Sequence, residues 1–397
     1  MSNTQLCLLS GELMPNVIGV LQTRPIRVLP VVSRESESQV RAFARALKAV
    51  GSPVEILDPV MVLPYDLTDC SKTLRKAIAD VTSPEVNWTG GTKIMSYAAR
   101  RLAEELHLPA LYVNTTAREL LLEDLSDGSQ RSEIIDTARL GLNVLVHLTA
   151  TGHLVEGADT LDGFRARCTP KPALVKAATL IMDARPGERT ELLRLAGAGN
   201  RPYSPRGIGP DFLRSLVDAL LIQPGALPNE YLLAAETLLH PFHLQTPQEQ
   251  NAMFLKNTYL EVFLWSQIKQ RAAVDDVAWH VVLNPGVKGR VAELDVTLAS
   301  EGRFLVLECK GHLDLHELAD VIEEQYARTK RIGRLFGRWM LYVHRHRADY
   351  TAANAASIIS SQEAKARDYG GKLLWHDDLA DLPITAAVFL NESEAAL

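Results

Sequence analysis

Short apolar runs alternate with amphipathic stretches through the first 150 residues of the chain. Between residues 36 and 50 the apolar positions recur three, four and seven apart, a spacing typical of a helix packed along one side. A second such helix is predicted at residues 93–106. The runs that predict strands lie at residues 5–10, 27–33, 54–57, 86–88 and 110–113. Strands separated by helices indicate βαβ units and a parallel, doubly wound sheet, which binds ligands at the carboxyl ends of its strands.

Two strand-to-helix junctions carry candidate binding residues. One is SGELMPN at residues 10–16, and the other is NWTGGTK at residues 87–93. Adjacent glycines allow the backbone to approach a ligand closely, and the N–H groups that open the next helix favour an anion. The alternative is a tight turn in which Thr89 or Thr92 caps the helix, because the run matches neither the dinucleotide fingerprint nor the Walker pattern.

The middle of the chain, residues 151–245, is interrupted by proline and glycine, most densely at residues 197–210. Helices are predicted at residues 174–182 and 212–221. We interpret this range as a helical connector.

The last third has a strong helical pattern at residues 251–270, with Glu261 inside its apolar band. A hairpin-like pair of strands follows at residues 291–298 and 303–310. Side chains alternate between the two faces of a strand, so Glu293 and Asp295 share a face, as do Glu308 and Lys310. Ionised groups on buried strands are costly unless they pair or hold a metal.

Two carboxylates on adjacent strands favour Mg²⁺ or Mn²⁺, which prefer oxygen ligands. A lysine beside them can orient the attacking water and stabilise charge on a phosphate. The alternative is an exposed edge hairpin with ion pairs across its strands. The run FLVLECK at residues 304–310 is too apolar for such an edge, which favours the metal site.

A basic segment follows this candidate site. Seven basic residues and no acidic one lie between Arg328 and Arg347. Arg331, Arg334 and Arg338 recur three and seven positions apart, which predicts a basic stripe on one helix face that contacts phosphates.

Composition limits the class of protein. The chain has 397 residues, 47% of them hydrophobic, and a net charge of −6, which is ordinary for a globular enzyme. It shows no signal-peptide pattern and no apolar run of the roughly 18–20 residues that span a membrane. The four cysteines are scattered without a CxxC pair, which excludes a cysteine zinc module and a disulfide scaffold. We expect a soluble, cytoplasmic protein without a membrane partner.

The run NWTGGTKIMSYAA resembles the signature loop of CARF domains, the CRISPR-associated Rossmann-fold sensors, and the opening SGELMPN and VVS segments are similar to that group. The resemblance implies a homodimer that binds a cyclic oligoadenylate, above all the tetra-adenylate, across the subunit interface. By position, the implied ligand-binding residues are Ser10, Gly11, Glu12, Asn16, Ser33, Thr89, Gly90, Gly91, Thr92 and Lys93.

The pattern of Asp295, twelve residues and then Glu-Cys-Lys resembles the PD-(D/E)XK nuclease core over about residues 246–350. It implies that Asp295 binds the metal, that Glu308 and Lys310 form the (D/E)XK pair, and that Glu261 is the helical acid; Glu293 can share the metal role. Leu294 replaces the proline that often precedes the aspartate. The metal ligands implied are Asp295, Glu308, the carbonyl of Cys309, and Glu261.

Both resemblances indicate the ancillary nucleases of type III CRISPR systems that cyclic oligoadenylates activate. We expect an α/β protein with a Rossmann-like CARF domain (1–150), a helical connector (151–245) and a restriction-endonuclease-like PD-(D/E)XK domain (246–397). Its substrate would be DNA or RNA and its cofactor Mn²⁺ or Mg²⁺. The alternatives are a ligand-independent restriction or repair nuclease, and a ligand-sensing regulator with an inactive nuclease fold that binds nucleic acid. A nicotinamide dehydrogenase is disfavoured, since no GxGxxG run follows a strand.

Overall fold

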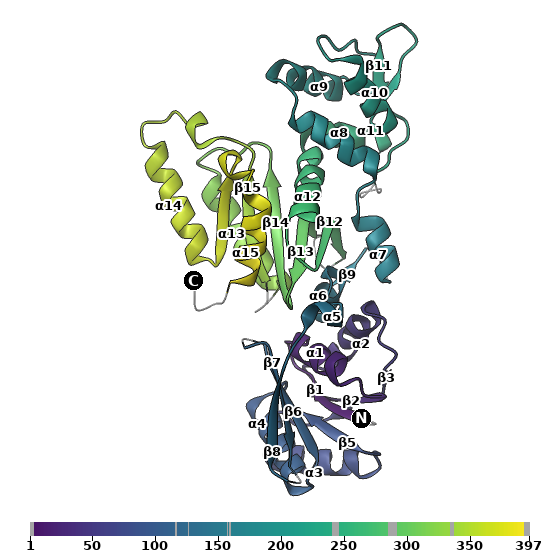
Figure 1. Ribbon diagram of the computed structural model, residues 1–397, viewed down its shortest axis with the longest axis vertical. Coiled ribbons are helices and arrows are strands. Elements are labelled where there is room, and N and C mark those ends of the chain that lie inside the picture. The colour runs from purple at the N-terminus through teal and green to yellow at the C-terminus, as the bar shows by residue number, and fades with distance from the viewer. Residues whose placement is uncertain are drawn as a thin grey trace.

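The computed structural model describes residues 4–115, 117–125, 127–156, 158, 160–239, 246–284, 292–333 and 337–392. Two sheets lie one beyond the other along the molecule, and a group of helices projects beside the second sheet at the far end (Figure 1). Among the described helices, none is both long enough and apolar enough to cross a membrane.

The N-terminal sheet has the strand order β3-β2-β1-β5-β6-β7-β8, and β4 pairs with β2. Its strands are β1 (Thr4–Leu8), β2 (Arg27–Val32), β3 (Glu55–Ile56), β4 (Val60–Met61), β5 (Pro84–Asn87), β6 (Pro109–Asn114), β7 (Glu119–Asp124) and β8 (Ser129–Ile134). Pairing is parallel from β3 to β6, and β7 and β8 add an antiparallel extension. This is the Rossmann-like sheet that the sequence predicts.

Helices cover both faces of this sheet because its central strands are apolar on both sides. The helices are α1 (Met14–Thr23), α2 (Gln39–Ala49), α3 (Leu67–Ala79) and α4 (Lys93–Glu105). In β1, Cys7 packs into the core formed with α1 and α2, whereas Leu6 and Leu8 pack into the core formed with α3 and α4. A strand buried on both faces has no polar side, which is typical of a doubly wound sheet.

The C-terminal sheet has the order β16-β15-β14-β13-β12-β9. Its strands are β9 (Leu154–Val155), β12 (Asp276–Asn284), β13 (Ala292–Ser300), β14 (Arg303–Lys310), β15 (Gly337–Val343) and β16 (Gly371–Trp375). The pairs from β9 to β14 are antiparallel and those from β14 to β16 are parallel. One face packs with α12 (Tyr259–Arg271) and α15 (Leu382–Asn391), and the other with α13 (Leu318–Gly333) and α14 (Ala355–Asp368).

The two sheets share one continuous core. The short helices α5 (Thr137–Leu140) and α6 (Val144–Ala150) connect them. Residues of α6 pack in the same cluster as Leu13 and Met14 of the N-terminal part and Phe304 and Val306 of β14. Leu13 of the first loop and the C-terminal sheet therefore belong to one packed cluster.

The range 151–245, which the sequence analysis interprets as a helical connector, contains helices but also contributes to the C-terminal sheet. It contains α7 (Leu161–Cys168), α8 (Pro172–Met182), α9 (Pro186–Ala198), α10 (Pro210–Asp218) and a hairpin of β10 (Ile222–Pro224) and β11 (Tyr231–Leu233). Its strand β9 pairs with β12. The chain then enters α11 (Pro247–Met253), a π-helical turn η1 (Phe254–Thr258) and α12.

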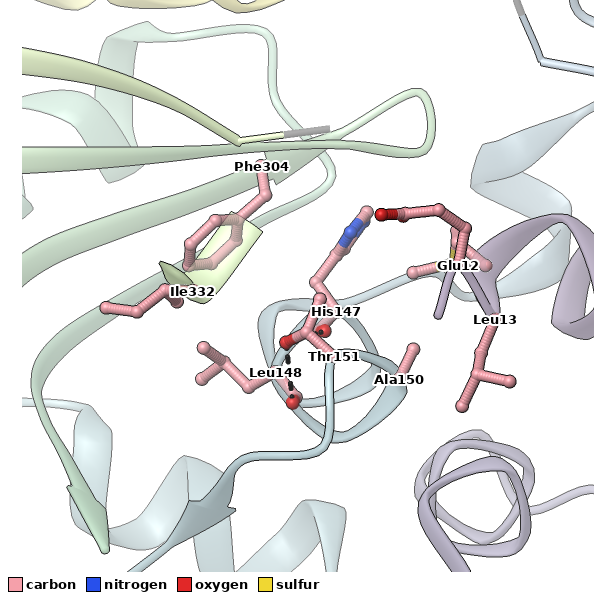
Figure 2. Close-up of a pocket in the computed structure, with 9 residues that line it drawn as sticks. Glu12, Leu13, His147, Leu148, Ala150, Thr151, Phe304 and Ile332 are labelled. Atoms are coloured by element: carbon pink, nitrogen blue, oxygen red, sulfur yellow. Dashed lines mark hydrogen bonds between the residues drawn. The ribbon is translucent and has the colours of Figure 1, made fainter. Parts of the chain in front are cut away.

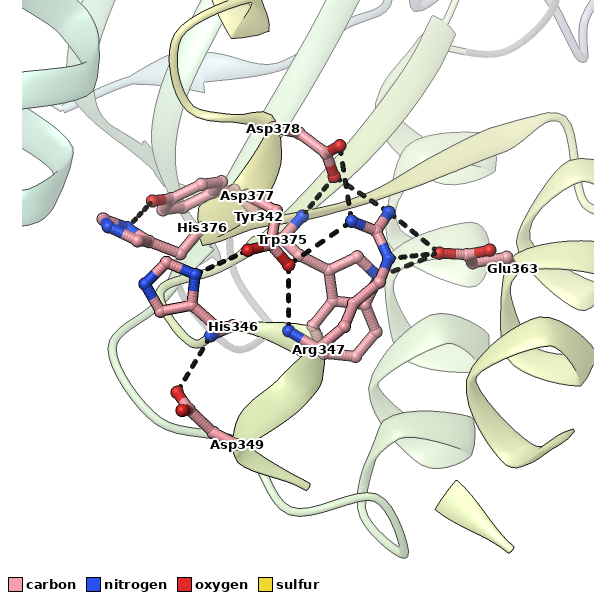
Figure 3. A network of polar contacts seen from close by, with 9 residues as sticks. All are labelled: Tyr342, His346, Arg347, Asp349, Glu363, Trp375, His376, Asp377 and Asp378. Atoms are coloured by element: carbon pink, nitrogen blue, oxygen red, sulfur yellow. Dashed lines mark hydrogen bonds and ion pairs between the residues drawn. The ribbon is translucent and has the colours of Figure 1, made fainter. Parts of the chain in front are cut away.

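A polar network joins the ends of β15 and β16, where the 3₁₀ turns η3 (Arg347–Asp349) and η4 (His376–Asp378) follow these strands (Figure 3). The guanidinium of Arg347 pairs with Glu363 at 3.1 Å and with Asp378 at 3.0 Å. Arg347 is one of the cations of the basic segment, and these ion pairs use its guanidinium to stabilise the fold.

The expected basic helix stripe is wrong for Arg338. Helix α13 ends at Gly333, and the apolar run that starts at Gly337 forms the buried strand β15. Arg338 is 8% exposed, and its guanidinium donates to the backbone carbonyls of Phe389 and Glu392. Arg338 therefore attaches the C-terminal helix, and Arg334 lies outside the described residues.

Candidate functional sites

The first candidate site lies at the carboxyl edge of the N-terminal sheet, where β1 stands between β2 and β5. The chain crosses from one side of β1 to the other here, which is the switch point where doubly wound sheets bind ligands. The loops that follow these three strands, together with the first turns of α1 and α4, carry all ten residues of the expected ligand site. They lie at positions Ser10, Gly11, Glu12 and Asn16, then Ser33, then Thr89, Gly90, Gly91, Thr92 and Lys93.

The first and third of these loops interlock at the end of β1. The side-chain amide of Asn16, which is fully buried, donates to the carbonyl of Leu8 at 3.0 Å. A Cβ atom on Gly90 would lie 2.0 Å from the oxygen of that same carbonyl, so only glycine fits. Gly91 has a φ of +78°, which glycine also adopts most readily. The double glycine is therefore required by the close approach of the two loops.

The two threonines of the third loop have internal partners. The hydroxyl of Thr89 donates to Asn87 at 2.7 Å and accepts from the backbone N–H of Val113 at 2.8 Å. The hydroxyl of Thr92 accepts from the N–H of Met95 at 3.2 Å, which is the N-cap of α4. The capping interpretation is thus confirmed for Thr92, whereas the Thr89 hydroxyl connects Asn87 of β5 with Val113 of β6.

Other residues of this sheet edge have atoms that solvent or a ligand can reach. Gly11 and Lys93 are exposed, and Ser10, Glu12, Gly90 and Gly91 are half-buried. Ser33 is buried, and its N–H donates to the hydroxyl of Ser36 at 2.9 Å. The glycine backbone and the Lys93 ammonium are accordingly what this edge offers an anionic ligand.

The second candidate site is an open cavity of about 820 Å³ in the C-terminal part. It is lined by all six residues that the sequence assigns to the nuclease core: the acids Glu261, Glu293, Asp295 and Glu308, then Cys309 and Lys310. Arg328 and Arg331 of α13 line it as well. The structure thus brings together one helix, two antiparallel strands and a second helix around this set.

Glu308 is the most heavily paired acid of the cavity. It is 4% exposed, and its two carboxylate oxygens accept from Lys310 at 2.7 Å and from Arg328 at 2.9 Å. Burial alone lowers the pKa of Lys310, but the charge and hydrogen bond of Glu308 outweigh it and raise the pKa. Lys310 is therefore an ammonium held beside the cavity.

Asp295 lies beside Glu308 on the neighbouring strand. Its carboxylate accepts from the backbone N–H of Cys309 at 2.7 Å. Burial, and then the charges of Glu308 and Glu261, raise the pKa of Asp295 well above its ordinary value. Burial likewise raises the pKa of Glu261. Acids with raised pKa values that converge in a cavity mark a place where a cation is favoured.

The donor set fits a divalent metal ion. Asp295 and Glu308 present carboxylate oxygens from adjacent strands, and hard cations such as Mg²⁺ and Mn²⁺ bind such oxygens. Burial and the nearby acids raise the pKa of the Cys309 thiol well above its ordinary value, and hard cations prefer oxygen ligands to sulfur. Only the backbone carbonyl of Cys309 is suited to the metal.

Sequence analysis missed His280 and underrated Arg328. His280 interrupts the apolar run of β12, and its Nδ1 lies 2.9 Å from Oε1 of Glu293. A polar residue inside an otherwise apolar strand was the available signal. Arg328 was counted only within the basic segment, although it pairs directly with Glu308 and with Glu324.

Comparison with known proteins supports the N-terminal assignment directly. Residues 4–142 match the family model described as the Card1 CARF domain. A search of curated protein sequences finds no match. The chain therefore contains a CARF domain in its first third.

Solved structures share the fold of the whole chain. Can2 from Sulfobacillus thermosulfidooxidans, in complex with cyclic tetra-adenylate, is 20% identical with a TM-score of 0.63, and the match covers 98% of this chain and 97% of Can2. Protein VC1899 from Vibrio cholerae is 16% identical with a TM-score of 0.67, and the match covers 98% and 97%. A type III CRISPR defence DNA nuclease activated by cyclic oligoadenylate is 17% identical with a TM-score of 0.54; the match covers 87% of this chain and 46% of that nuclease. At these identities the likeness is one of fold.

Proposed function

We propose that this protein is a metal-dependent nuclease that a cyclic oligoadenylate, most of all cyclic tetra-adenylate, activates in type III CRISPR antiviral defence. The observation that carries the proposal is the convergence of Asp295, Glu308 and Lys310 in one cavity of a chain that contains a CARF domain. The fold shared with Can2, which was solved with cyclic tetra-adenylate, supports the identity of the ligand.

The metal would be held by the carboxylates of Asp295 and Glu308, the backbone carbonyl of Cys309, and Glu261. When bound, Mn²⁺ or Mg²⁺ supplies Lewis-acid polarisation of the phosphate and lowers the pKa of the attacking water. The backbone N–H of Cys309 fixes the Asp295 carboxylate at 2.7 Å, so that this ligand is oriented before substrate arrives.

Lys310 orients the attacking water and stabilises the negative charge that develops on the phosphate. Its ammonium is placed by Glu308 and is part of the cavity wall. Arg331 is exposed at the same wall and contacts the phosphate backbone of DNA or RNA. The net charge of −6 is compatible with binding a nucleic acid, because the cations that contact the phosphates, Lys310 and Arg331, lie at the cavity itself.

The sensor would work as a homodimer. Four apolar side chains near the ligand edge are exposed, namely Met61, Leu63, Tyr65 and Tyr97. Three of them flank Pro64, whose carbonyl accepts a hydrogen bond from Thr92 of the glycine loop at 2.5 Å. A second copy that buries this patch would bring both glycine loops to one two-fold axis, where a ring with two-fold character fits.

A path from the ligand loop to the nuclease lies in the packing between the sheets. Glu12 and Leu13 of the first loop, with Met14 at the start of α1, line a small cavity together with His147 of α6, Phe304 of β14 and Ile332 of α13 (Figure 2). Ile332 stands one turn after Arg328, which binds Glu308. A ligand that favours one position of the first loop would therefore bias the nuclease cavity, through its different affinity for the two states.

The decisive experiment incubates the purified protein with Mn²⁺ and labelled single-stranded DNA or RNA, with and without cyclic tetra-adenylate. Cleavage that depends on the ligand is expected. Equal cleavage in both samples would instead favour a ligand-independent nuclease. Metal binding without any cleavage would favour a regulator with an inactive nuclease fold. Running both nucleic acids identifies the substrate.

A further inference from the structure

His280 has an unusual backbone for its position. It lies in the middle of β12 with a φ of +51°, in the left-handed region. Its neighbours Trp279 and Val281 pair in register with Val296 and Leu294 of β13, so the ladder is broken at one residue, opposite Asp295. Strained backbone in a strand persists only where the surroundings hold it, and it clusters at functional sites.

The imidazole of His280 faces two carboxylates. Its Nδ1 lies 2.9 Å from Oε1 of Glu293 and 3.8 Å from Oε2 of Glu261. One ligand atom from each of these three residues lies within 4.8 Å of the other two. Around an octahedral ion bound at about 2.1 Å, adjacent ligand atoms are about 3 Å apart and opposite ones about 4.2 Å apart. The three side chains have the spacing of a metal site.

Glu261 is also oriented from outside this group. The indole N–H of Trp279 donates to Oε2 of Glu261 at 3.3 Å. Such second contacts fix a carboxylate for metal binding. The charges of both Glu293 and Glu308 act on Glu261, so this carboxylate lies between the group around His280 and the group around Glu308.

The donor chemistry of the two groups differs. Asp295 and Glu308 offer oxygen only, which suits Mg²⁺ as well as Mn²⁺. An imidazole with two carboxylates suits Mn²⁺, Fe²⁺ or Zn²⁺ and is poorly matched to Mg²⁺.

We propose that Glu261, His280 and Glu293 form a second divalent-metal site, selective for a transition metal such as Mn²⁺, beside the site of Asp295 and Glu308. It deepens the proposed function, because Glu261 would then connect two ions in one nuclease cavity.

The test measures Mn²⁺ bound per chain by calorimetric titration and by electron paramagnetic resonance. The full-length protein is expected to bind two ions. His280→Gly, which removes the imidazole and suits the left-handed backbone, is expected to bind one ion, as is Glu293→Gln. The ion that remains in these variants shows that the cavity is folded. Mg²⁺ is expected to displace one of the two ions.

Glu308→Ala is the matched variant of the first site, and it separates this inference from the proposed function. It is expected to lose the other ion and keep the one that depends on His280. If His280→Gly still binds two ions, or if the full-length protein binds a single ion that only Glu308→Ala removes, the second site is refuted while the nuclease proposal stands. If Glu308→Ala loses nothing and His280→Gly loses an ion, the second site stands and the metal assignment of the proposed function fails.

Discussion

The ammonium of Lys310 lies 2.7 Å from a carboxylate oxygen of Glu308, two residues earlier on the same strand. Residues two apart on a strand share a face, so the strand itself fixes this pair, and the intervening Cys309 supplies its backbone to Asp295. Arg328 closes the other side of Glu308 at 2.9 Å. The cavity therefore presents a cation and an acid as one rigid unit.

Glu308→Gln and Lys310→Met should each lower ligand-activated cleavage by about 10²–10³-fold, because the first removes a carboxylate that would hold the metal and the second removes the cation that stabilises charge on the scissile phosphate. Binding of cyclic tetra-adenylate should not change, since that site lies on the other sheet. The measurement is cleavage of a labelled oligonucleotide with Mn²⁺. Glu323→Gln is the matched control, because Glu323 lies on the same helix as Arg328 but pairs with Lys365 outside the cavity. Full activity in Glu308→Gln would overturn the assignment of the site.

Gly90→Ala should disrupt the ligand edge. The added Cβ would lie 2.0 Å from the carbonyl oxygen of Leu8 and 2.7 Å from the amide nitrogen of Asn16. Two loops must separate to admit it, so we expect a loss of about 2–4 kcal/mol of stability and at least about tenfold weaker ligand binding.

Gly197→Ala is the matched control for that variant, because nothing lies within 4 Å of the Cβ it adds in α9. Its stability should be unchanged or higher by up to about 1 kcal/mol. Urea unfolding and calorimetric titration with cyclic tetra-adenylate measure both effects. Equal behaviour of the two variants would show that the loops do not interlock as described.

The core of each site could be predicted from sequence because it depends on local regularities. Asp295 and Glu308 come together through strand alternation and a short hairpin, and the Gly90 loop through a strand-to-helix turn. Both regularities act over a few residues, so spacing alone reveals them. The match of residues 4–142 to a CARF domain confirms that resemblance.

What sequence reasoning missed depends on long-range contacts or unusual backbone. The spacing of Arg331 and Arg338 fits a helix, but α13 ends at Gly333 and Arg338 enters a buried strand. Arg347 belongs to the basic segment in the sequence, but in the fold it pairs with Glu363 and Asp378, which follow it by 16 and 31 residues. His280 lies beside Glu261 and Glu293 with a backbone φ of +51°, which no periodicity predicts.

Acid should destabilise the contact between the two sheets through His147. This side chain is 4% exposed, and its Nε2 has no hydrogen-bond partner in the part of the chain that the structure describes. Burial lowers the pKa of His147 from 6.5 to about 3. The unfolded chain therefore takes up a proton near pH 6.5 that the folded chain refuses, so stability is complete above that pH and falls below it.

The expected slope from His147 is about 1.4 kcal/mol per pH unit between roughly pH 6 and 3. His147→Leu should remove this contribution and flatten the dependence of the urea midpoint on pH. Burial also lowers the pKa of His344 to about 3, so a second contribution of the same sign should remain. His316→Leu, at an exposed position, is the control and should keep the full slope. An unchanged slope in His147→Leu would mean that this histidine is protonated in the folded protein.

Dimerisation through the exposed apolar patch should be required for activation. Tyr65 is 81% exposed and Leu63 is 59% exposed, on the loop whose Pro64 carbonyl binds Thr92. Large apolar side chains grouped in this way are typical of an interface. Tyr65→Glu places a charge in that patch and should convert the dimer to a monomer, with at least about tenfold weaker binding of cyclic tetra-adenylate.

Ile384→Glu, at a 55% exposed site on α15 of the other sheet, is the matched control and should stay dimeric. Light scattering coupled to size-exclusion chromatography gives the oligomeric state. A Tyr65→Glu dimer that still binds ligand would place the interface elsewhere, because a carboxylate buried between two copies without a partner is too costly to be accommodated.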